Sequence, residues 1–233
     1  MFKTTEKAQN TKKHLFEVAI QAFADQGFDK TTMRGLAKTA GVTPSHFYYY
    51  YPSKESLVMS YYELSQKQHE EAMGQYFETE KSFEKRLHRL FRTKIETAQP
   101  YKDMARSLFR TAADPRSPMS PFSDESRELR TQAMLMCKEL VETSDEEFHP
   151  RLRETLPHYL WLLMLGMILF WIYDRSEGSK NTFDLVDKVV PLLVGFHKSL
   201  NTPIGLLFRG RVFGLLDDFD GLFDFSDTNN KGE

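Results

Sequence analysis

The chain has 233 residues, of which 40% are hydrophobic and 27% are charged, and it contains a single cysteine, Cys137. The hydrophobic fraction excludes a disordered chain, and the length suits one large domain or two of modest size. One cysteine excludes an internal disulfide and a cysteine-based metal site and favours a reducing, cytoplasmic compartment. We expect no secretory signal, because the first residues are polar and charged.

The net charge of −2 is unevenly distributed along the chain. Residues 1–57 hold eight Lys and Arg against five Asp and Glu, and residues 58–216 hold 22 of each kind. Residues 217–233 hold six acidic residues and one Lys. The overall charge therefore does not exclude nucleic-acid binding, since only the basic end has to meet phosphate. The changes of charge divide the chain into segments 1–57, 58–216 and 217–233, the last an acidic tail that we expect to be partly disordered.

The hydrophobic pattern predicts an all-α protein. Phe16, Ala19, Ile20 and Phe23 recur at helical spacing within an amphipathic helix over residues 5–25, which Gly27 ends. Further helices are expected over residues 33–40, 44–50, 54–79, 81–98, 101–113, 124–143, 150–174, 182–200 and 204–216. Loops are expected over residues 114–123, which hold three prolines, and 175–181. No useful length of the chain alternates as a strand would.

The segment from Gly27 to Leu57 carries the functional signal. Two short helices flank Gly41, whose tolerance of positive φ suits a tight turn between them. The small residues Ala37 and Ala40 allow the two helices to cross closely. This is the pattern of a helix-turn-helix domain, whose second helix enters the DNA major groove by its first residues.

Candidate DNA contacts follow from this geometry. Four residues begin the second short helix, two tyrosines point outward from it, and Lys54 begins the next helix, where free N–H groups favour an anion. Two further candidates lie at the start of the first short helix. The full set is Thr32, Arg34, Thr43, Pro44, Ser45, His46, Tyr48, Tyr49 and Lys54.

At these positions the sequence resembles the DNA-binding signature of TetR/AcrR-type transcriptional repressors. The resemblance is carried by Phe23, Gly27, Phe28, Thr32, Leu36, Ala37, Ala40, Gly41, Val42, Tyr48, Pro52, Ser53, Lys54, Glu55 and Leu57. It implies an all-α homodimer that binds a pseudo-palindromic operator and is released by a ligand held in a divergent C-terminal domain. Two positions depart from the pattern. The first is Ser45, which stands where the family often has glycine, and the second is Gly35. Gly35 occupies what we take as the interior of a helix, at a cost of about 1 kcal/mol.

The run from Tyr159 to Tyr173 holds no charged residue. It is short for a membrane span, which needs roughly 20 apolar residues, and Pro157 and His158 bound it. A helix that is apolar all round is otherwise buried on all sides, most simply with one face on its own core and the other on a second subunit. The resemblance agrees with this dimer. The expected interface residues are Leu165, Leu169, Ile172, Val186, Val190, Leu193, Val194 and His197.

The existence of an effector pocket rests on the resemblance alone. Large, partly flexible apolar side chains in the 58–216 segment would suit a small, largely apolar ligand, although each could equally be ordinary core. The candidates are Met104, Leu108, Phe109, Met134, Trp161 and Met164.

Catalytic and cofactor signals are not found in the sequence. The seven histidines show no metal-binding spacing, and no phosphate-binding or nucleophile motif occurs. We therefore expect a regulator rather than an enzyme, without cofactor or metal. An alternative from another class is a helical dimeric protein that binds a protein partner or a membrane surface and uses DNA as a location cue.

Overall fold

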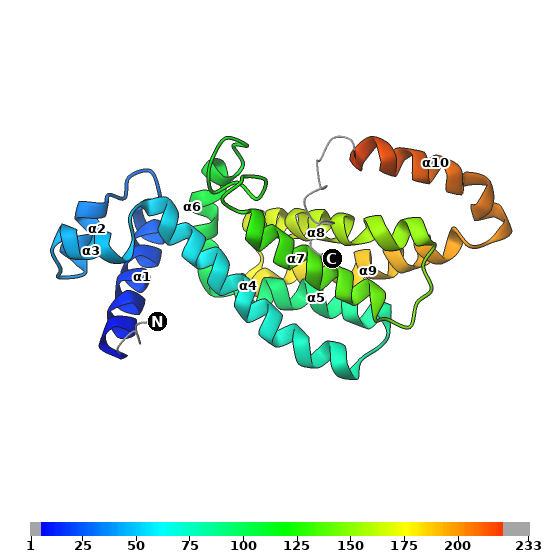
Figure 1. Ribbon diagram of the computed structural model, residues 1–233, viewed down its shortest axis with the longest axis horizontal. Helices are drawn as coiled ribbons and strands as arrows, with labels where there is room; N and C mark the ends of the chain where they lie inside the picture. Colours follow the sequence, from blue (N-terminus) through cyan, green and yellow to red (C-terminus); the bar gives the residue numbers. More distant parts are fainter. Residues whose placement is uncertain (1–5, 221–233) are drawn as a thin grey trace, which may run out of the picture. The chain divides into compact units, whose positions relative to one another are not determined.

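The computed structural model describes residues 6–220, and this part of the chain is helical, with no strand (Figure 1). The helices are α1 Glu6–Gln26, α2 Met33–Thr39, α3 Pro44–Tyr50, α4 Lys54–Thr79, α5 Phe83–Ala98, α6 Lys102–Ala112, α7 Arg127–Glu142, α8 Pro150–Tyr173, α9 Lys180–Ser199 and α10 Pro203–Asp220. Short 3-10 helices at Gln99–Tyr101 and Glu177–Ser179 precede α6 and α9. The all-α prediction is confirmed, and most predicted helices end within three residues of the observed ones.

Pro157 lies inside α8, in agreement with the helix predicted over residues 150–174. One boundary differs from the prediction. The last helix was expected to end at residue 216, but α10 continues through Asp220. The first four residues of the predicted acidic tail are therefore helical. The side chain of Asp217 forms an ion pair with Arg151. Residues 221–233 of that tail lie outside the described part of the chain.

The chain divides into two compact units whose limits do not coincide with residue 57. The first comprises residues 1–68 and 97–130, and the second comprises residues 69–96 and 131–233. The boundaries fall within α4, α5 and α7. The first unit therefore contains α1 to α3, the first part of α4, and α6.

The core of the first unit joins α1 to α6 and to the short helices. Leu15, Ala19 and Phe23 of α1 are fully buried, as is Phe47 of α3. The prediction named Phe16 and Ile20 beside Ala19 and Phe23, but these two side chains are only partly buried and Leu15 takes the central place.

The core of the second unit is built around α8. One face of α8 packs against α5, α7 and α9 through Leu160, Trp161, Met164 and Met167. The opposite face is exposed, as at Leu169, Phe170 and Tyr173. By length and composition α8 could cross a membrane, but buried helices of water-soluble proteins meet the same test.

Two polar side chains fix the ends of helices in this unit. Arg86 is fully buried and donates hydrogen bonds to the carbonyls of Phe77 and Glu80 at the end of α4, and to Thr143 Oγ1 at 2.7 Å. Asp174 follows α8 and accepts hydrogen bonds from the backbone N–H and hydroxyl of both Ser176 and Thr182, at 2.7–2.8 Å. These bonds hold the α4–α5 and α8–α9 connections.

Several predicted interface residues are interior residues of one protomer. Val186 and Val190 are fully buried, and Val194, His197 and Ile172 are nearly so. These five side chains pack inside the protomer and leave little or no surface for a second subunit. The helices are apolar on both faces, so their sequence did not distinguish the inward face from the outward one.

Candidate nucleic-acid interface and effector cavity

The helix-turn-helix is held by local hydrogen bonds that its sequence specifies. Thr32 and Thr43 cap α2 and α3, accepting hydrogen bonds from the N–H groups of Gly35 at 3.1 Å and His46 at 3.3 Å. Gly41 has a φ of 68°, and the N–H of Val42 bonds to the carbonyl of Ala37 at 3.0 Å. The expected tight turn is confirmed. Gly35 is the third residue of α2, inside the helix as expected and within its first turn. A Cβ there would lie 3.1 Å from Thr32 Oγ1, the atom that caps the helix.

Anchors on the inner side of α3 determine which residues face outward. Phe47 is fully buried and Tyr51 is nearly so, with the Tyr51 hydroxyl donating to the carbonyl of Lys12 at 3.3 Å. Burial is the main cause that raises the pKa of Tyr51 to about 12, with a contribution from the charge of Glu63. Tyr51 therefore remains a neutral donor, and its expected inward position is confirmed.

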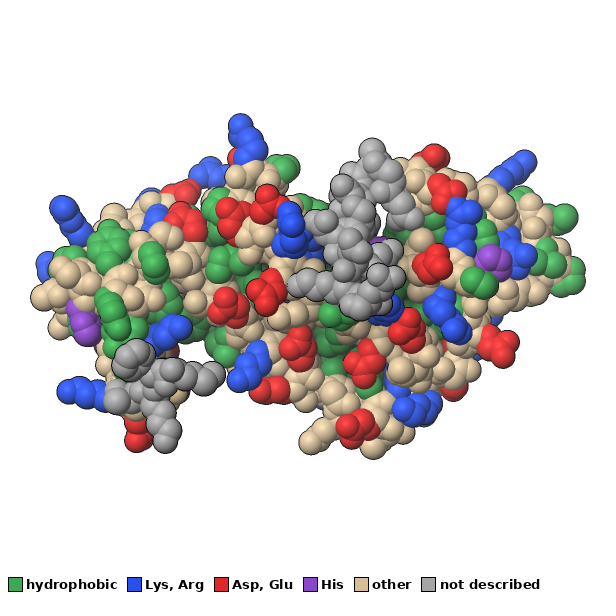
Figure 2. All heavy atoms as spheres, viewed as in Figure 1, with side chains coloured by type: hydrophobic (Ala, Val, Ile, Leu, Met, Phe, Trp, Pro, Cys, Tyr) green, Lys and Arg blue, Asp and Glu red, His purple; other side chains and the backbone are tan. Residues whose placement is uncertain are grey.

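The outward face of the helix-turn-helix carries most of the predicted DNA contacts. Eight of the nine predicted residues are exposed, and Tyr49 is the most open aromatic among them, at 81%. His46 and Tyr50 meet edge to face with ring centroids 5.4 Å apart. The space-filling view shows basic side chains and a histidine at this end of the first unit (Figure 2). The eight residues are Thr32, Arg34, Thr43, Pro44, Ser45, His46, Tyr48 and Tyr49.

Lys54 is the ninth predicted contact and is only half-exposed. Its ammonium donates to the carbonyl of Phe28 at 2.7 Å and lies 4.2 Å from the centroid of the Phe28 ring. The helix N-terminus predicted a phosphate contact at this position. The structure adds a second role, because this contact connects the start of α4 to Phe28 in the loop that follows α1.

The start of α1 lies beside α3, which the sequence pattern did not predict. Lys7, Asn10 and His14 of α1 line an open groove together with Val42 and His46. The sequence pattern predicted α1 only as a core helix. The polar residues between its apolar positions were the available signal, but only the packing of α1 brings them next to the first turn of α3.

Comparisons with known proteins now decide the family. The family described as "Bacterial regulatory proteins, tetR family" matches residues 15–60, and the "Tetracyclin repressor-like, C-terminal domain" matches residues 86–201. The chain belongs to the TetR family. It is a DNA-binding transcriptional regulator, and this identity favours that function over the alternative of an interaction protein that uses DNA only as a location cue.

Individual relatives of this TetR-family chain agree with the assignment. The regulator AcrR of Shigella flexneri is 38% identical over 64 residues, which cover 28% of this chain and 30% of AcrR. FadR from Bacillus subtilis, solved with stearoyl-CoA, is similar in fold with a TM-score of 0.61 at 15% identity, over 78% of this chain and 97% of that one. FadR from Thermus thermophilus, solved with lauroyl-CoA, gives a TM-score of 0.53 at 21% identity, over 77% and 92%. The AcrR match spans under a third of that protein.

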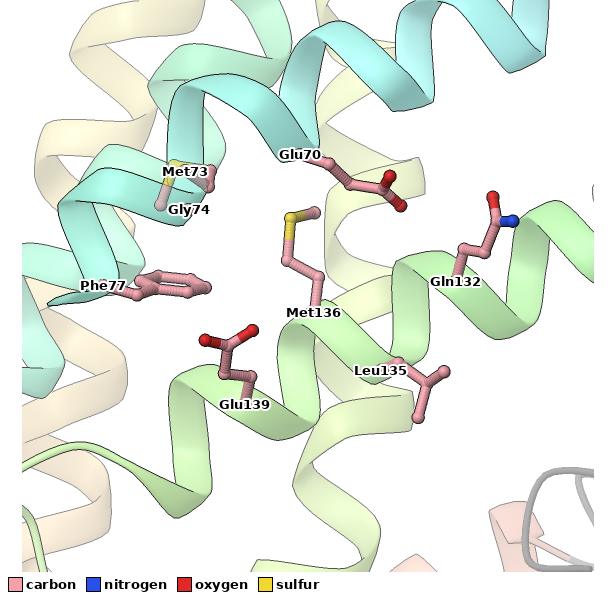
Figure 3. Close-up of a pocket in the computed structure, with 8 residues that line it drawn as sticks. All are labelled: Glu70, Met73, Gly74, Phe77, Gln132, Leu135, Met136 and Glu139. Atoms are coloured by element: carbon pink, nitrogen blue, oxygen red, sulfur yellow. The ribbon is translucent and has the colours of Figure 1, made fainter. Parts of the chain in front are cut away.

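A cavity of about 230 Å³, open to the surface at Gly74, Leu135 and Glu139, lies in the second unit of this regulator, between α4 and α7 (Figure 3). It is lined by Glu70, Met73, Gly74, Phe77, Gln132, Leu135, Met136 and Glu139. None of the six predicted ligand residues lines it. Met104 and Leu108 are buried in the core of the first unit, while Met134, Trp161 and Met164 are core residues of the second. None of these side chains contributes to this cavity, and the pocket expected from them stays a prediction. Phe109 is half-buried and also lies in the first unit.

Among residues 6–220, no group of three or more His, Cys, Asp or Glu side chains is arranged to hold a metal ion. Burial raises the pKa of the Cys137 thiol to about 12, so this cysteine stays protonated within the core.

Proposed function

We propose that this TetR-family regulator is a cytoplasmic homodimeric repressor that binds a pseudo-palindromic operator and leaves it when a small effector binds the second unit. The observation that carries the proposal is the outward face of α3. Ser45, His46 and Tyr49 are exposed there, while Phe47 is buried beneath them. A recognition helix reads base edges in the major groove with such outward residues at its start.

The exposed apolar face of α8 and α9 supports a homodimer. Leu192 is 70% exposed and Phe196 is 52% exposed on α9, and on α8 Leu169 and Tyr173 are similarly open. An apolar patch of this kind is typical of an interface, where a stable dimer buries about 800 Å² on each partner. Leu165 and Leu193 are half-exposed and belong to the same proposed interface. The proposed interface thus uses the faces of α8 and α9 opposite those that form the protomer core.

Effector release would act through the spacing of the two recognition helices. Each helix must meet a half-site about 34–36 Å from the other, because that is one turn of DNA. A ligand that binds better to a dimer with another spacing shifts the population toward the form that does not bind. Two neighbours of similar fold were solved with acyl-CoA ligands. This supports ligand control here, but not the same ligand.

The test is a fluorescence-anisotropy titration of the purified protein with the DNA upstream of its own gene, and with random DNA, over a series of salt concentrations. We expect the upstream DNA to bind at least about a thousandfold more tightly. Equal affinity for both DNAs at every salt concentration would show that specific operator binding is wrong.

Variants separate contacts to bases from contacts to phosphate. His46→Ala should weaken binding to the operator. It should also reduce the free-energy difference between preferred and other bases at particular positions by about 1–3 kcal/mol. Tyr49→Phe should lower the affinity for both DNAs by the same factor, as expected for loss of a hydroxyl that contacts phosphate. Lys180→Ala, at the exposed start of α9, serves as the control for a surface substitution in the second unit and should change neither affinity.

A further inference from the structure

The cavity between α4 and α7 is formed by two matching helical stripes. Its α4 wall is Glu70, Met73, Gly74 and Phe77, and its α7 wall is Gln132, Leu135, Met136 and Glu139. Both sets follow the spacing i, i+3, i+4, i+7, which places four side chains along one face of a helix. Figure 3 shows Gln132 opposite Glu70 and Glu139 opposite Phe77, so the two helices run in the same direction along the cavity.

The carboxylates consequently lie toward opposite ends of the cavity. Glu70 is the first lining residue on α4, and Glu139 is the last one on α7. Seven residues of helix advance about 10 Å, which is the expected separation of the two ends. Met73 and Met136 line the space between them, Phe77 lies opposite Glu139, and all three side chains are buried. The cavity therefore has a carboxylate at each end, of which Glu70 also interacts with Lys94, and an apolar surface in the middle.

From this geometry we infer that the effector is an elongated apolar molecule with a cationic group at each end, of which an α,ω-diamine is the simplest example. The inference rests on the proposed ligand-dependent release and specifies its ligand class. None of the eight lining residues is Lys, Arg or His. A cation at either end gains a carboxylate partner, whereas the phosphates of an acyl-CoA would meet two like charges. The polarizable methionines and the Phe77 ring suit the apolar middle of such a molecule.

Two cations, Arg86 and Lys94, interact with residues that line the cavity. Arg86 donates its N–H groups to the backbone of α4 and to Thr143, and it lies 5.1 Å from the centroid of the Phe77 ring. Burial lowers the pKa of Lys94 to about 8, although the charge of Glu70 acts to raise it. Glu70 thus shares its charge with Lys94, and Glu139 is the better residue for a substitution test.

Gly74 offers a way to fill the cavity without disturbing the fold. A Cβ at this position would meet no atom within 4 Å, so a side chain there can extend into the open space. Glycine inside a helix also costs stability relative to residues with a side chain. Gly74→Leu should therefore occupy the cavity and leave the melting temperature unchanged or higher.

The experiment measures direct binding by isothermal titration calorimetry with the full chain and without DNA. The probes are 1,8-diaminooctane, octylamine, 1,8-octanediol and suberate, which share an apolar middle and differ in the charge of their ends. We expect the diamine to bind about tenfold more tightly than octylamine, because octylamine has one ammonium group and lacks one partly screened ion pair. The diol and suberate should not bind measurably. The affinity for the diamine should fall as ionic strength rises, because salt screens its ion pairs.

Variants then locate the site. Glu139→Gln should reduce diamine affinity about tenfold, to the level of octylamine on the unaltered protein. Gly74→Leu should abolish binding of the diamine. Glu78→Gln removes a charge from the same helix at an exposed position that does not line the cavity, and should leave affinity unchanged. Circular dichroism and melting temperature verify that each variant is folded.

Each outcome has a defined meaning. Failure of the diamine to bind, equal binding of diamine and diol, or unchanged binding to folded Glu139→Gln and Gly74→Leu overturns the inference about the ligand. Adding the diamine to the protein–operator complex tests the proposed function separately. Binding that follows the predicted pattern without release of DNA supports the ligand class and contradicts ligand-controlled release.

Discussion

At the scale of single residues, several side chains serve the fold where the sequence indicated only surface contacts. Lys54 was predicted as a phosphate contact, but its ammonium donates to the Phe28 carbonyl and covers the Phe28 ring. A charged group in this position stabilises the protein through a hydrogen bond to a partly buried carbonyl as well as through long-range attraction to DNA.

Lys54→Met keeps the apolar stem and removes the ammonium. We expect the free energy of unfolding to fall by about 1 kcal/mol, and affinity for all DNA sequences to fall alike. Urea denaturation and DNA titration measure the two effects. Lys30→Met, an exposed neighbour in the same connection, is the control, and its stability should be unchanged. An unaltered unfolding midpoint for Lys54→Met would contradict the assigned structural role.

Asp174 makes stability depend on pH. Burial raises the pKa of its carboxyl, but hydrogen bonds from Ser176 and Thr182 outweigh burial and hold the pKa at about 2, below the ordinary value of 3.8. Because the folded pKa lies below the unfolded one, the contribution to stability is complete above pH 4 and is lost as the pH falls toward 2.

Asp174→Asn should therefore lower stability at pH 7 and reduce the loss of stability between pH 4 and pH 2. The measurement is the melting temperature of both proteins over this pH range. Glu177→Gln, an exposed substitution in the same connection, should leave the profile as it is. Parallel profiles for Asp174→Asn and the unaltered protein would show that this carboxylate does not titrate as described.

At the scale of the element, the helix-turn-helix was the part of the fold most open to prediction. Its signals are local: Thr32 and Thr43 lie three residues before the amides that they cap, and Gly41 supplies the positive φ within the turn. Such interactions depend on neighbouring residues and not on distant packing, so the sequence alone indicates them.

Thr43→Ala removes the cap of α3 without removing a buried side chain. We expect a loss of about 1 kcal/mol in unfolding free energy, because the N–H of His46 loses its acceptor. Thr43→Asn should restore most of the stability, since asparagine caps helices equally well. Chemical denaturation compares the three proteins. If alanine and asparagine have the same effect, the cap does not contribute as inferred.

At the scale of the whole molecule, the exposed apolar faces of α8 and α9 indicate assembly. Leu192 and Phe196 are exposed, whereas Val190 and Val194 on the same helix are buried in the protomer. Dimerisation would bury the first pair and leave the second unaffected.

Leu192→Glu places a charge on this face without disturbing the protomer core. We expect a folded monomer and a large loss of operator affinity, because one protomer can occupy only one half-site. Sedimentation velocity measures the mass, and circular dichroism verifies the fold. Lys180→Glu, an exposed charge change at the start of the same helix, is the control. A Leu192→Glu protein that remains dimeric would place the interface elsewhere.

The sequence by itself determined the helical class, the helix boundaries to within a few residues, and the helix-turn-helix with its outward contacts. These rest on caps, turns and periodicity, which act over a few residues. Only the tertiary structure decided which apolar side chains are core, which line the cavity, and which remain exposed. Met104 packs beside α1, Met136 lines the cavity, and Val190 is buried while Leu192 is open. The physical reason is that a helix apolar on all faces carries no pattern that distinguishes them, so packing against other helices makes the choice.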